Sequence, residues 1–420
     1  MPILINESYL LKDTNASNAV DTINLPRHRW YYYKEGFSPE LVKNAIEDLG
    51  IGDDSLVIDP FNGSGTVTLT CSMQGVRALG IEVNPFTAFI ANTKSLNADG
   101  QLLLRQSEEL VTFIRENEFE SPRIGFSTFT EKPGIDKWLF NKDVINSFET
   151  GLQYLRLYAN GEVSDILKLS LISALIANAN ARRDGKCLKY KSHWKEIGYD
   201  RESFLSSFCE KSKCCVEDVG KIQIPVVPRI VCQDARNGIN NLVQEPFSLC
   251  ITSPPYLNTF DYTDIYRPEL FMGGFVDNNE DLYRLRMKTV RSHIQANWAT
   301  PVGMRFGREF NNVMKHLYSH PDMLMHPRIP KMVQAYFEDM YMVLGALFGK
   351  AQKGAQVWLV VSTSAYAGIE IPVDIIIGKI GKKVGFKLRS VNELRKIRKR
   401  KTRYSGNIEL LRESLIILAK

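Results

Sequence analysis

The sequence predicts an α/β protein built on a doubly wound, mostly parallel sheet. Near the start of the chain, an apolar strand at 55–58 is followed by a glycine loop, a helix and a second strand at 78–81. Strand patterns return at 229–232 and 247–251, and apolar helices alternate with strands from Pro330 onward. A strand–helix–strand unit with a short turn is the usual opening of this fold class.

The first half of the sheet domain is expected at residues 1–97. It begins with an irregular segment and a helix whose start is marked by Ser38 and Pro39, because Ser caps free amides and Pro fits the first turn. The helix after the glycine loop is predicted near 67–74, and Gly75 ends it.

Residues 98–228 are interpreted as a mostly helical insertion, because apolar residues recur there at three- and four-residue spacing. We expect helices at 137–160 and 163–182. The second half of the sheet domain is expected at 229–420, with an irregular, polar and aromatic segment at 257–330 that is a candidate for target recognition. Beyond it we predict a helix to 348, a strand at 356–361, a helix at 371–383, and strands at 386–391 and 413–418.

The composition is typical of a folded globular protein. Lys and Arg number 53 against 47 Asp and Glu, a net charge of +6 that does not by itself imply a nucleic-acid partner. No apolar stretch approaches the roughly 20 residues of a membrane helix, and the first residues lack a secretion signal. We therefore expect a cytoplasmic protein without membrane contact. Seven cysteines without CxxC spacing favour buried, reduced thiols and no metal site.

A glycine loop, Asp59-Pro60-Phe61-Asn62-Gly63-Ser64-Gly65, lies between the first strand and its helix. Gly63 and Gly65 allow backbone angles that other residues avoid, and let a ligand approach the main chain. A dinucleotide fingerprint fits badly, since Thr68 replaces its third glycine. Asp59 favours a ligand with a positive group, such as an α-amino group or a sulfonium. A tight turn without a ligand is the alternative.

Two acidic residues stand at the ends of later strands. Glu82 could accept both hydroxyls of a ribose, or could be a solvated strand-end residue. Asp234 could accept a hydrogen bond from an adenine amino group, and it could equally cap the following helix.

The sharpest motif is Thr252-Ser253-Pro254-Pro255-Tyr256, which follows an apolar strand. Two successive prolines fix the backbone, so that its carbonyls point outward. With the Ser253 hydroxyl, they can bind an amino group that must lose its conjugation before it attacks. Tyr256 offers a flat face on which an extruded base can stack. A plain loop is the alternative.

These segments resemble the S-adenosylmethionine-dependent amino-methyltransferases of DNA. The glycine loop is similar to the cofactor loop of that family, Thr252–Tyr256 to its catalytic motif, and 411–418 to its closing strand. The resemblance covers roughly 27–97, 229–260 and 330–420. It implies a Rossmann-like methyltransferase fold whose C-terminal strand is antiparallel.

The resemblance also implies a cofactor and site residues. S-adenosylmethionine would be bound by Phe37, Ser38, Asp59, Phe61, Gly63, Gly65, Glu82, Asp234 and Thr252. Catalysis would rest on Ser253, Pro254, Pro255 and Tyr256.

The function implied is site-specific methylation of the exocyclic amine of a flipped DNA base. Ser253, where adenine-specific relatives have Asp, favours cytosine N4. The cofactor loop precedes the catalytic motif, in contrast to many such relatives, so adenine N6 stays open. An RNA base methyltransferase and a catalytically silent nucleic-acid-binding protein are further alternatives. Double-stranded DNA is the expected partner, and a separately encoded restriction nuclease is a second candidate.

Two basic segments are candidates for phosphate contacts. Residues 395–403 hold seven Lys or Arg in nine positions, on a predicted connection near the catalytic edge. A second basic and aromatic patch lies at 182–191 in the helical insertion, and a solvated surface is the alternative for both. The candidate nucleic-acid-binding residues are Arg182, Arg183, Lys186, Arg395, Lys396, Arg398, Lys399, Arg400, Lys401 and Arg403.

Overall fold

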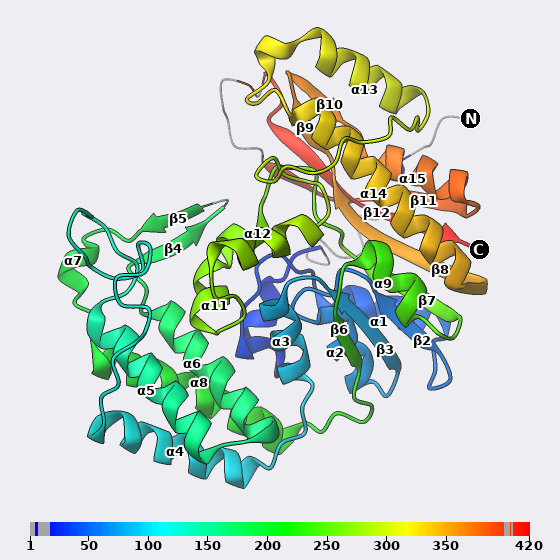
Figure 1. Ribbon diagram of the computed structural model, residues 1–420. Helices are drawn as coiled ribbons and strands as arrows, with labels where there is room; N and C mark the ends of the chain where they lie inside the picture. Colours follow the sequence, from blue (N-terminus) through cyan, green and yellow to red (C-terminus); the bar gives the residue numbers. More distant parts are fainter. Residues whose placement is uncertain (1–4, 7–16, 186, 399–403, 405) are drawn as a thin grey trace.

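A central eight-stranded sheet organises the computed structural model, which describes residues 5–6, 17–185, 187–398, 404 and 406–420 (Figure 1). Its strand order is β1-β11-β12-β8-β7-β2-β3-β6. All neighbouring strands are parallel except β12, which runs antiparallel to both β8 and β11. The predicted Rossmann-like, doubly wound sheet with an antiparallel C-terminal strand is therefore confirmed. The strands are β1 (Ile5–Asn6), β2 (Leu56–Asp59), β3 (Arg77–Glu82), β6 (Arg229–Cys232), β7 (Phe247–Thr252), β8 (Ala351–Ser362), β11 (Lys387–Arg398) and β12 (Leu410–Ala419).

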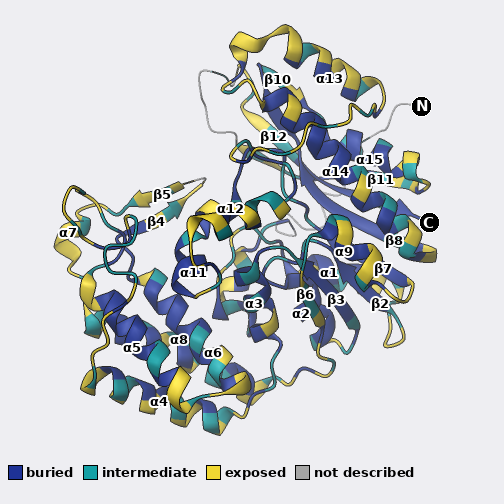
Figure 2. Cartoon of the chain, viewed as in Figure 1, coloured by how far each residue is buried: buried dark blue, intermediate teal, exposed yellow. Residues whose placement is uncertain are grey.

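Helices cover both faces of this sheet, so its central strands β2 and β7 are buried on both sides (Figure 2). Val57 packs with α1 and α2 on one face, while its neighbour Ile58 packs with α9, α14 and α15 on the other. Ser38 caps α1 and Pro39 is its first residue, as predicted. The covering helices are α1 (Pro39–Leu49), α2 (Thr66–Met73), α3 (Pro85–Lys94), α9 (Ala235–Leu242), α14 (Ile329–Lys350) and α15 (Val373–Val384).

A helical lobe lies beside the sheet domain and is built mainly from the predicted insertion (Figure 1). Its core also includes Phe86 from α3 and Phe271 from α11, so neighbouring parts of the chain complete it. The lobe contains α4 (Gly100–Glu116), α5 (Lys142–Tyr158), α6 (Gly161–Ala177), α7 (Trp194–Ile197), α8 (Arg201–Lys221) and the hairpin β4 (Ala181–Asp184) and β5 (Cys187–Tyr190).

The predicted helix at 163–182 was too long. It ends at Ala177, where the Asn178 side chain donates to the carbonyl of Ala174. Two residues further on, the Asn180 N–H donates to the carbonyl of Leu139, which is distant in the sequence, and not to a helix carbonyl. Long-range pairing therefore diverts the chain into the β4–β5 hairpin, which apolar spacing alone does not reveal.

Segment 257–330 was predicted to be irregular, which holds for residues 289–307 and is wrong for the helical parts. It holds four helices, two of which start at side-chain caps: Asp261 for α10 and Asn278 for α12. They are short or strongly polar, so their apolar periodicity is weak. The four are α10 (Tyr262–Ile265), α11 (Arg267–Met272), α12 (Asn279–Lys288) and α13 (Arg308–Ser319). A small hairpin, β9 (Ser364–Tyr366) and β10 (Ile369–Ile371), follows β8.

The basic run was placed on a connection, but its first four residues, 395–398, belong to strand β11. Arg395 pairs with Glu413 and Arg398 with Leu410 in the β11–β12 ladder. Residues 399–401 and 403, with Lys186 of the other basic patch, lie outside the described residues.

The cysteines agree with only part of the prediction made for them. All seven cysteines are unpaired, but Cys187, Cys209 and Cys232 are exposed, contrary to the expected burial. Within the described ranges, no cluster of His, Cys, Asp and Glu has the arrangement of a metal site. No helix in the same ranges is long and apolar enough to cross a membrane.

Candidate active site

A cavity of about 280 Å³ opens at the carboxyl ends of β2, β3, β6 and β7. Parallel strands end at a common edge, so the residues that follow them meet there. Segments 60–64, 82–84 and 253–256 line the cavity together with Asp234. The structure thus brings together the predicted cofactor loop, the two strand-end acids and the predicted catalytic motif.

Asp59, the last residue of β2, is 2% exposed and joins two of the motifs. Its Oδ1 accepts hydrogen bonds from the Phe61 amide at 3.0 Å and from the Thr252 hydroxyl at 2.6 Å. No described residue donates to Oδ2, and Asp59 lines the cavity. Burial raises the pKa of this carboxyl to about 7, against the opposing hydrogen bonds. The free oxygen is therefore suited to a ligand group that carries a positive charge.

The two predicted loop glycines have different roles. Gly63 has φ +49°, lines the cavity, and donates its N–H to Glu82 at 2.7 Å. Gly65 has φ +85° and does not line the cavity. A Cβ at Gly65 would lie 2.8 Å from the Cβ of Ala91, so this glycine lets α2 approach α3.

Glu82 is held by backbone amides on both of its oxygens. Gly63 N–H donates to Oε2, and Asn84 N–H donates to Oε1 at 2.8 Å. Burial raises the pKa of this carboxyl. Each oxygen keeps a lone pair, so the carboxylate can still accept hydrogen bonds from hydroxyls in the cavity.

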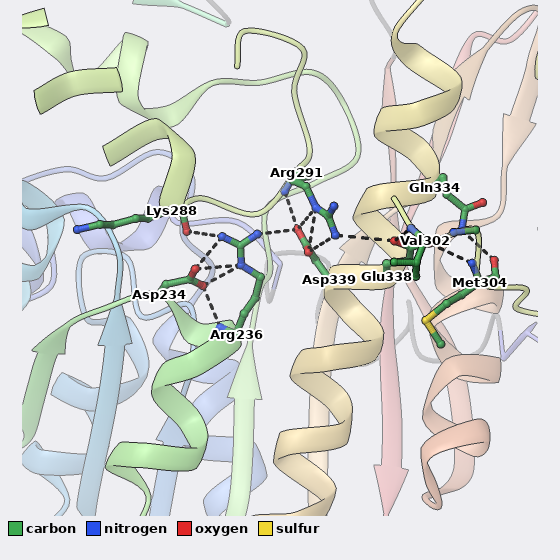
Figure 3. Close-up of polar contacts among 10 residues, drawn as sticks. Asp234, Arg236, Lys288, Arg291, Val302, Met304, Gln334, Glu338 and Asp339 are labelled. Carbon is green, nitrogen blue, oxygen red and sulfur yellow. Dashed lines mark hydrogen bonds and ion pairs between the residues drawn. The ribbon is translucent and has the colours of Figure 1, made fainter. Parts of the chain in front are cut away.

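Asp234 caps α9 and lines the cavity, so the two sequence interpretations are compatible. Its carboxylate also forms an ion pair with Arg236, at 2.7 Å from Nη2 to Oδ2 (Figure 3). Arg236 reaches Asp339 on α14 as well, at 3.2 Å. The acid that faces the cavity is therefore fixed by an arginine that also contacts another helix.

Asp339 and its neighbour Glu338 bind the loop between α12 and α13, residues 289–307, to α14 (Figure 3). Asp339 is 1% exposed and accepts hydrogen bonds from Arg236 and from Arg291, the latter at 2.8 Å. Glu338 accepts three successive backbone amides, at residues 302–304. This network was not predicted from the sequence, although two adjacent acids inside an apolar helix, Glu338 and Asp339, were a usable signal.

The predicted catalytic motif begins at the end of β7. Thr252 is fully buried and does not line the cavity, whereas Ser253, both prolines and Tyr256 do. The Ser253 hydroxyl donates to the carbonyl of Val360 at 3.2 Å. The Tyr256 hydroxyl donates to Glu413 at 2.7 Å, and burial raises the pKa of this tyrosine well above its usual value.

Aromatic rings form part of the cavity wall. Phe260 and Tyr262 have ring centroids 4.6 Å apart, and Tyr33 lies against Gly63. Planar side chains of this kind can enclose a planar ligand. Phe260 and Tyr262 lie in the segment to which the sequence analysis assigned no site residue.

Other predicted site residues lie in and around the cavity. Phe37 and Phe61 line it. Ser38 does not, because its hydroxyl caps α1 and donates to Asp21 at 2.5 Å.

Two of the predicted phosphate-binding arginines are bound to internal carboxylates. Arg395 lines the cavity and pairs with Glu413 at 2.6 Å, and Arg183 pairs with the fully buried Glu269. Exposed side chains among the candidates are Arg182, Lys396 and Arg398.

Comparison with known proteins shows similarity to DNA methyltransferases. A family model described as "DNA methylase" for N6 and N4 enzymes matches residues 5–93. The Type II methyltransferase M.BsoBI of Geobacillus stearothermophilus is 26% identical over 445 residues, which span 94% of this chain and 85% of the relative. These matches support an amino-methyltransferase of the N4/N6 family. Methyltransferases of this kind use S-adenosylmethionine as the methyl donor, which the likeness implies here.

Further relatives differ in how much of this chain they match. The Type II methyltransferase M.AvaI of Nostoc sp. is 25% identical and spans 87% of the chain and 80% of its own length. A tRNA (guanine(10)-N2)-dimethyltransferase of Methanothermobacter thermautotrophicus is 27% identical over 85 residues, 20% of the chain and 25% of its own length. A solved rRNA methyltransferase of Streptomyces viridochromogenes has TM-score 0.31 and 10% identity, over 91% of this chain and 85% of its own. The fold assignment rests on the strand order above.

Proposed function

We propose that this chain methylates DNA, transferring a methyl group from S-adenosylmethionine to the exocyclic amine of a flipped base, cytosine N4. The hydrogen bond between Asp59 and Thr252 carries the proposal. It fixes the glycine loop to the start of the Thr-Ser-Pro-Pro-Tyr motif, so that both line one cavity. A methyl donor and an amine acceptor bound there would meet.

The residues present fit the cofactor. Asp59, with its free Oδ2, would bind a positively charged end, and Glu82 would accept the ribose hydroxyls. Asp234 would accept the adenine amino group, while Phe37 and Phe61 would enclose the ligand. The cofactor would supply an electrophilic methyl group on a positively charged sulfur.

The target amine would be bound by the catalytic motif. Because the Ser253 hydrogen is donated to Val360, the lone pairs of Ser253 Oγ remain free to accept a hydrogen bond from the amine. Such a bond would localise the nitrogen lone pair for attack on the methyl group that the cofactor would supply, with the sulfur as leaving group. The amine proton would then be lost to water. The ring of Tyr256 would stack on the base. Well-oriented reactants can gain roughly 7–11 kcal/mol from positioning alone.

Charge and aromatic side chains on the helical lobe support DNA as the partner. Residues 181–200 hold six Lys or Arg against three Asp or Glu, so this short segment has half of the net charge of +6. On the same surface, the ammonium of Lys195 lies 5.4 Å and 5.5 Å from the ring centroids of Trp138 and Trp194. Exposed cations beside aromatic rings suit a phosphate backbone. The domain division at 98–228 would make this lobe the DNA-contacting part.

The chain-length relatives favour DNA over RNA as the substrate. The Type II methyltransferases match most of the chain, whereas the tRNA enzyme matches one fifth of it. We also propose, from the Type II relatives, that a separately encoded restriction nuclease acts on the same DNA sites. Because its substrate would be genomic DNA, the enzyme would act in the cytoplasmic compartment that holds the chromosome.

The test is methylation of DNA that carries no methyl groups, such as DNA copied by whole-genome amplification. The chain is incubated with isotope-labelled S-adenosylmethionine, and the digested nucleosides are analysed by mass spectrometry. Labelled N4-methylcytosine is the expected product. Only N6-methyladenine would overturn the choice of base and leave the class intact. Label in RNA and none in DNA would instead identify an RNA methyltransferase, and no transfer to either would favour a silent binding protein.

A further inference from the structure

Glu413 is a buried acid at the catalytic edge that belongs to neither sequence motif. It lies in β12, is 2% exposed and lines the cavity. Its Oε1 accepts the hydroxyl of Tyr256 at 2.7 Å, and its Oε2 accepts Nε of Arg395 at 2.6 Å. A second nitrogen of Arg395 donates to the carbonyl of Ser17 at 3.4 Å. The three side chains form a linear chain of contacts that ends on the catalytic tyrosine.

A bulge in the sheet places Arg395 in this chain. In the β11–β12 ladder, Glu393 pairs with Ser414 and Arg395 pairs with Glu413, so Leu394 is an extra residue on β11. A bulge of this kind re-aims the side chain that follows it. Here the bulge brings the guanidinium of Arg395 to the cavity, where it is paired with the carboxylate of Glu413.

Two constraints then fix the ring of Tyr256. Its backbone follows two prolines, whose φ angles are locked. Its hydroxyl is held by Glu413, and Glu413 is held by Arg395. A phenol anchored at both ends cannot swing about its side-chain torsions, so the plane of its ring is set before any base arrives.

We propose that Glu413 and Arg395 are positioning residues for methyl transfer, holding the ring of Tyr256 in the plane on which the target base stacks. This inference rests on the proposed function. It gives the hydroxyl of Tyr256 an anchoring role, and it gives Arg395 an internal partner in place of a DNA phosphate.

A double-mutant cycle separates positioning from simple stability. If Glu413 acts through the hydroxyl of Tyr256, then Tyr256→Phe and Glu413→Ala each lower kcat by roughly 10- to 100-fold, because small misplacements have effects of that size. The double variant should then be no worse than the poorer single variant. Glu413→Gln, which keeps one acceptor, should retain more activity than Glu413→Ala. The affinity for S-adenosylmethionine should stay within about twofold in all of them, because none touches the cofactor side.

The neighbouring residue on the same strand offers a matched control. Arg412 precedes Glu413 and pairs with the fully buried Asp374 at 2.8 Å, away from the cavity. Asp374→Asn therefore removes a buried β12 ion pair of the same kind without reaching Tyr256. It should lower the melting temperature and leave kcat per folded molecule unchanged.

The experiment measures kcat and KM on methyl-free amplified DNA, the Kd for S-adenosylmethionine by calorimetry, and the melting temperature of each variant. If Glu413→Ala does not fold, the cycle is run with Glu413→Gln. Additive decreases in the cycle, or an equal decrease of kcat in Asp374→Asn, would overturn the positioning role while the methyltransferase stands. Wild-type protein that methylates no DNA would overturn the proposed function, and this inference with it.

Discussion

The affinity for S-adenosylmethionine should depend on pH through Asp59. Burial raises the pKa of this carboxyl to about 7. Near neutral pH, Asp59 is therefore protonated and uncharged in a large share of the ligand-free molecules. A cationic ligand group beside the free Oδ2 requires the carboxylate. Binding should therefore release a proton from Asp59, and should tighten as the pH rises through 7.

The size of the effect follows from the ionised fraction of Asp59. With a pKa of about 7, roughly 9% of the carboxyls are ionised at pH 6.0 and about 76% at pH 7.5. If only the ionised form binds, the affinity should rise by about eightfold between these two values. The α-amino group of the ligand begins to lose its own charge near pH 7.7–8.0, which sets the upper limit of the range.

Calorimetric titration in two buffers of different ionisation enthalpy measures both the Kd and the protons released. Asp59→Asn is the matched variant, because it keeps the shape and cannot titrate. We expect it to bind weakly and with no pH dependence between 6.0 and 7.5. A wild-type Kd that is flat over this range, or the same slope in Asp59→Asn, would refute the assignment of Asp59 to the positive end of the ligand.

The same carboxyl should also affect stability, with a sign that can be worked out. Because the pKa of Asp59 is higher in the folded protein than in the unfolded chain, the folded state binds more protons between about pH 4 and pH 7. The free energy of unfolding should therefore fall as the pH rises through this window. In Asp59→Asn, the free energy of unfolding should lose the part of this decrease that is due to Asp59. Denaturant titrations at pH 5 and pH 8 would measure the difference.

Four further predictions concern packing, the loop network, DNA binding and the flipped base. Gly65→Val should cost more than about 2 kcal/mol of unfolding free energy, because a β-branched residue at φ +85° also meets Ala91. Asp339→Asn should cost about 3 kcal/mol by leaving two arginines underpaired, as urea unfolding would show. Replacing the basic residues at 398–401 with Gln should lower the log–log salt slope of DNA binding by roughly 0.9 for each phosphate that the protein no longer neutralises, and an unchanged slope would make them a solvated surface. Tyr256→Ala should weaken base stacking by about 1–3 kcal/mol, measured as affinity for DNA, without weakening cofactor binding.

Local backbone chemistry is what the sequence predicts well here. The glycine loop after β2 and the two prolines after β7 restrict the chain through the residues themselves, so their positions at strand ends could be predicted directly. The strand predicted at 229–232 is β6, residue for residue. The predicted start of α1 at Ser38 and Pro39 is confirmed for the same reason, since a cap depends on two or three adjacent residues.

Elements stabilised mainly by distant contacts were predicted poorly. A predicted helix was extended into the first two residues of the β4–β5 hairpin, and the helices α10 to α13 were assigned to an irregular segment. Their sequences have weak or ambiguous periodicity, and packing against the rest of the molecule decides their conformation. The basic run was assigned to a loop by its charge, although residues 395–398 complete a strand.

The sequence by itself predicted the fold class, which the structure confirms. It also predicted a candidate cofactor loop and a candidate catalytic motif, because each of these is a contiguous stretch of residues. Only the tertiary structure decided which side chains complete the site. Thr252 meets Asp59 across 193 residues, and Glu413 meets Tyr256 across 157. Such pairs depend on the order of strands in the sheet and on a single bulge in β11. A buried acid on a strand shows in the sequence only as one polar residue among apolar ones, since the partner that neutralises it lies on another strand.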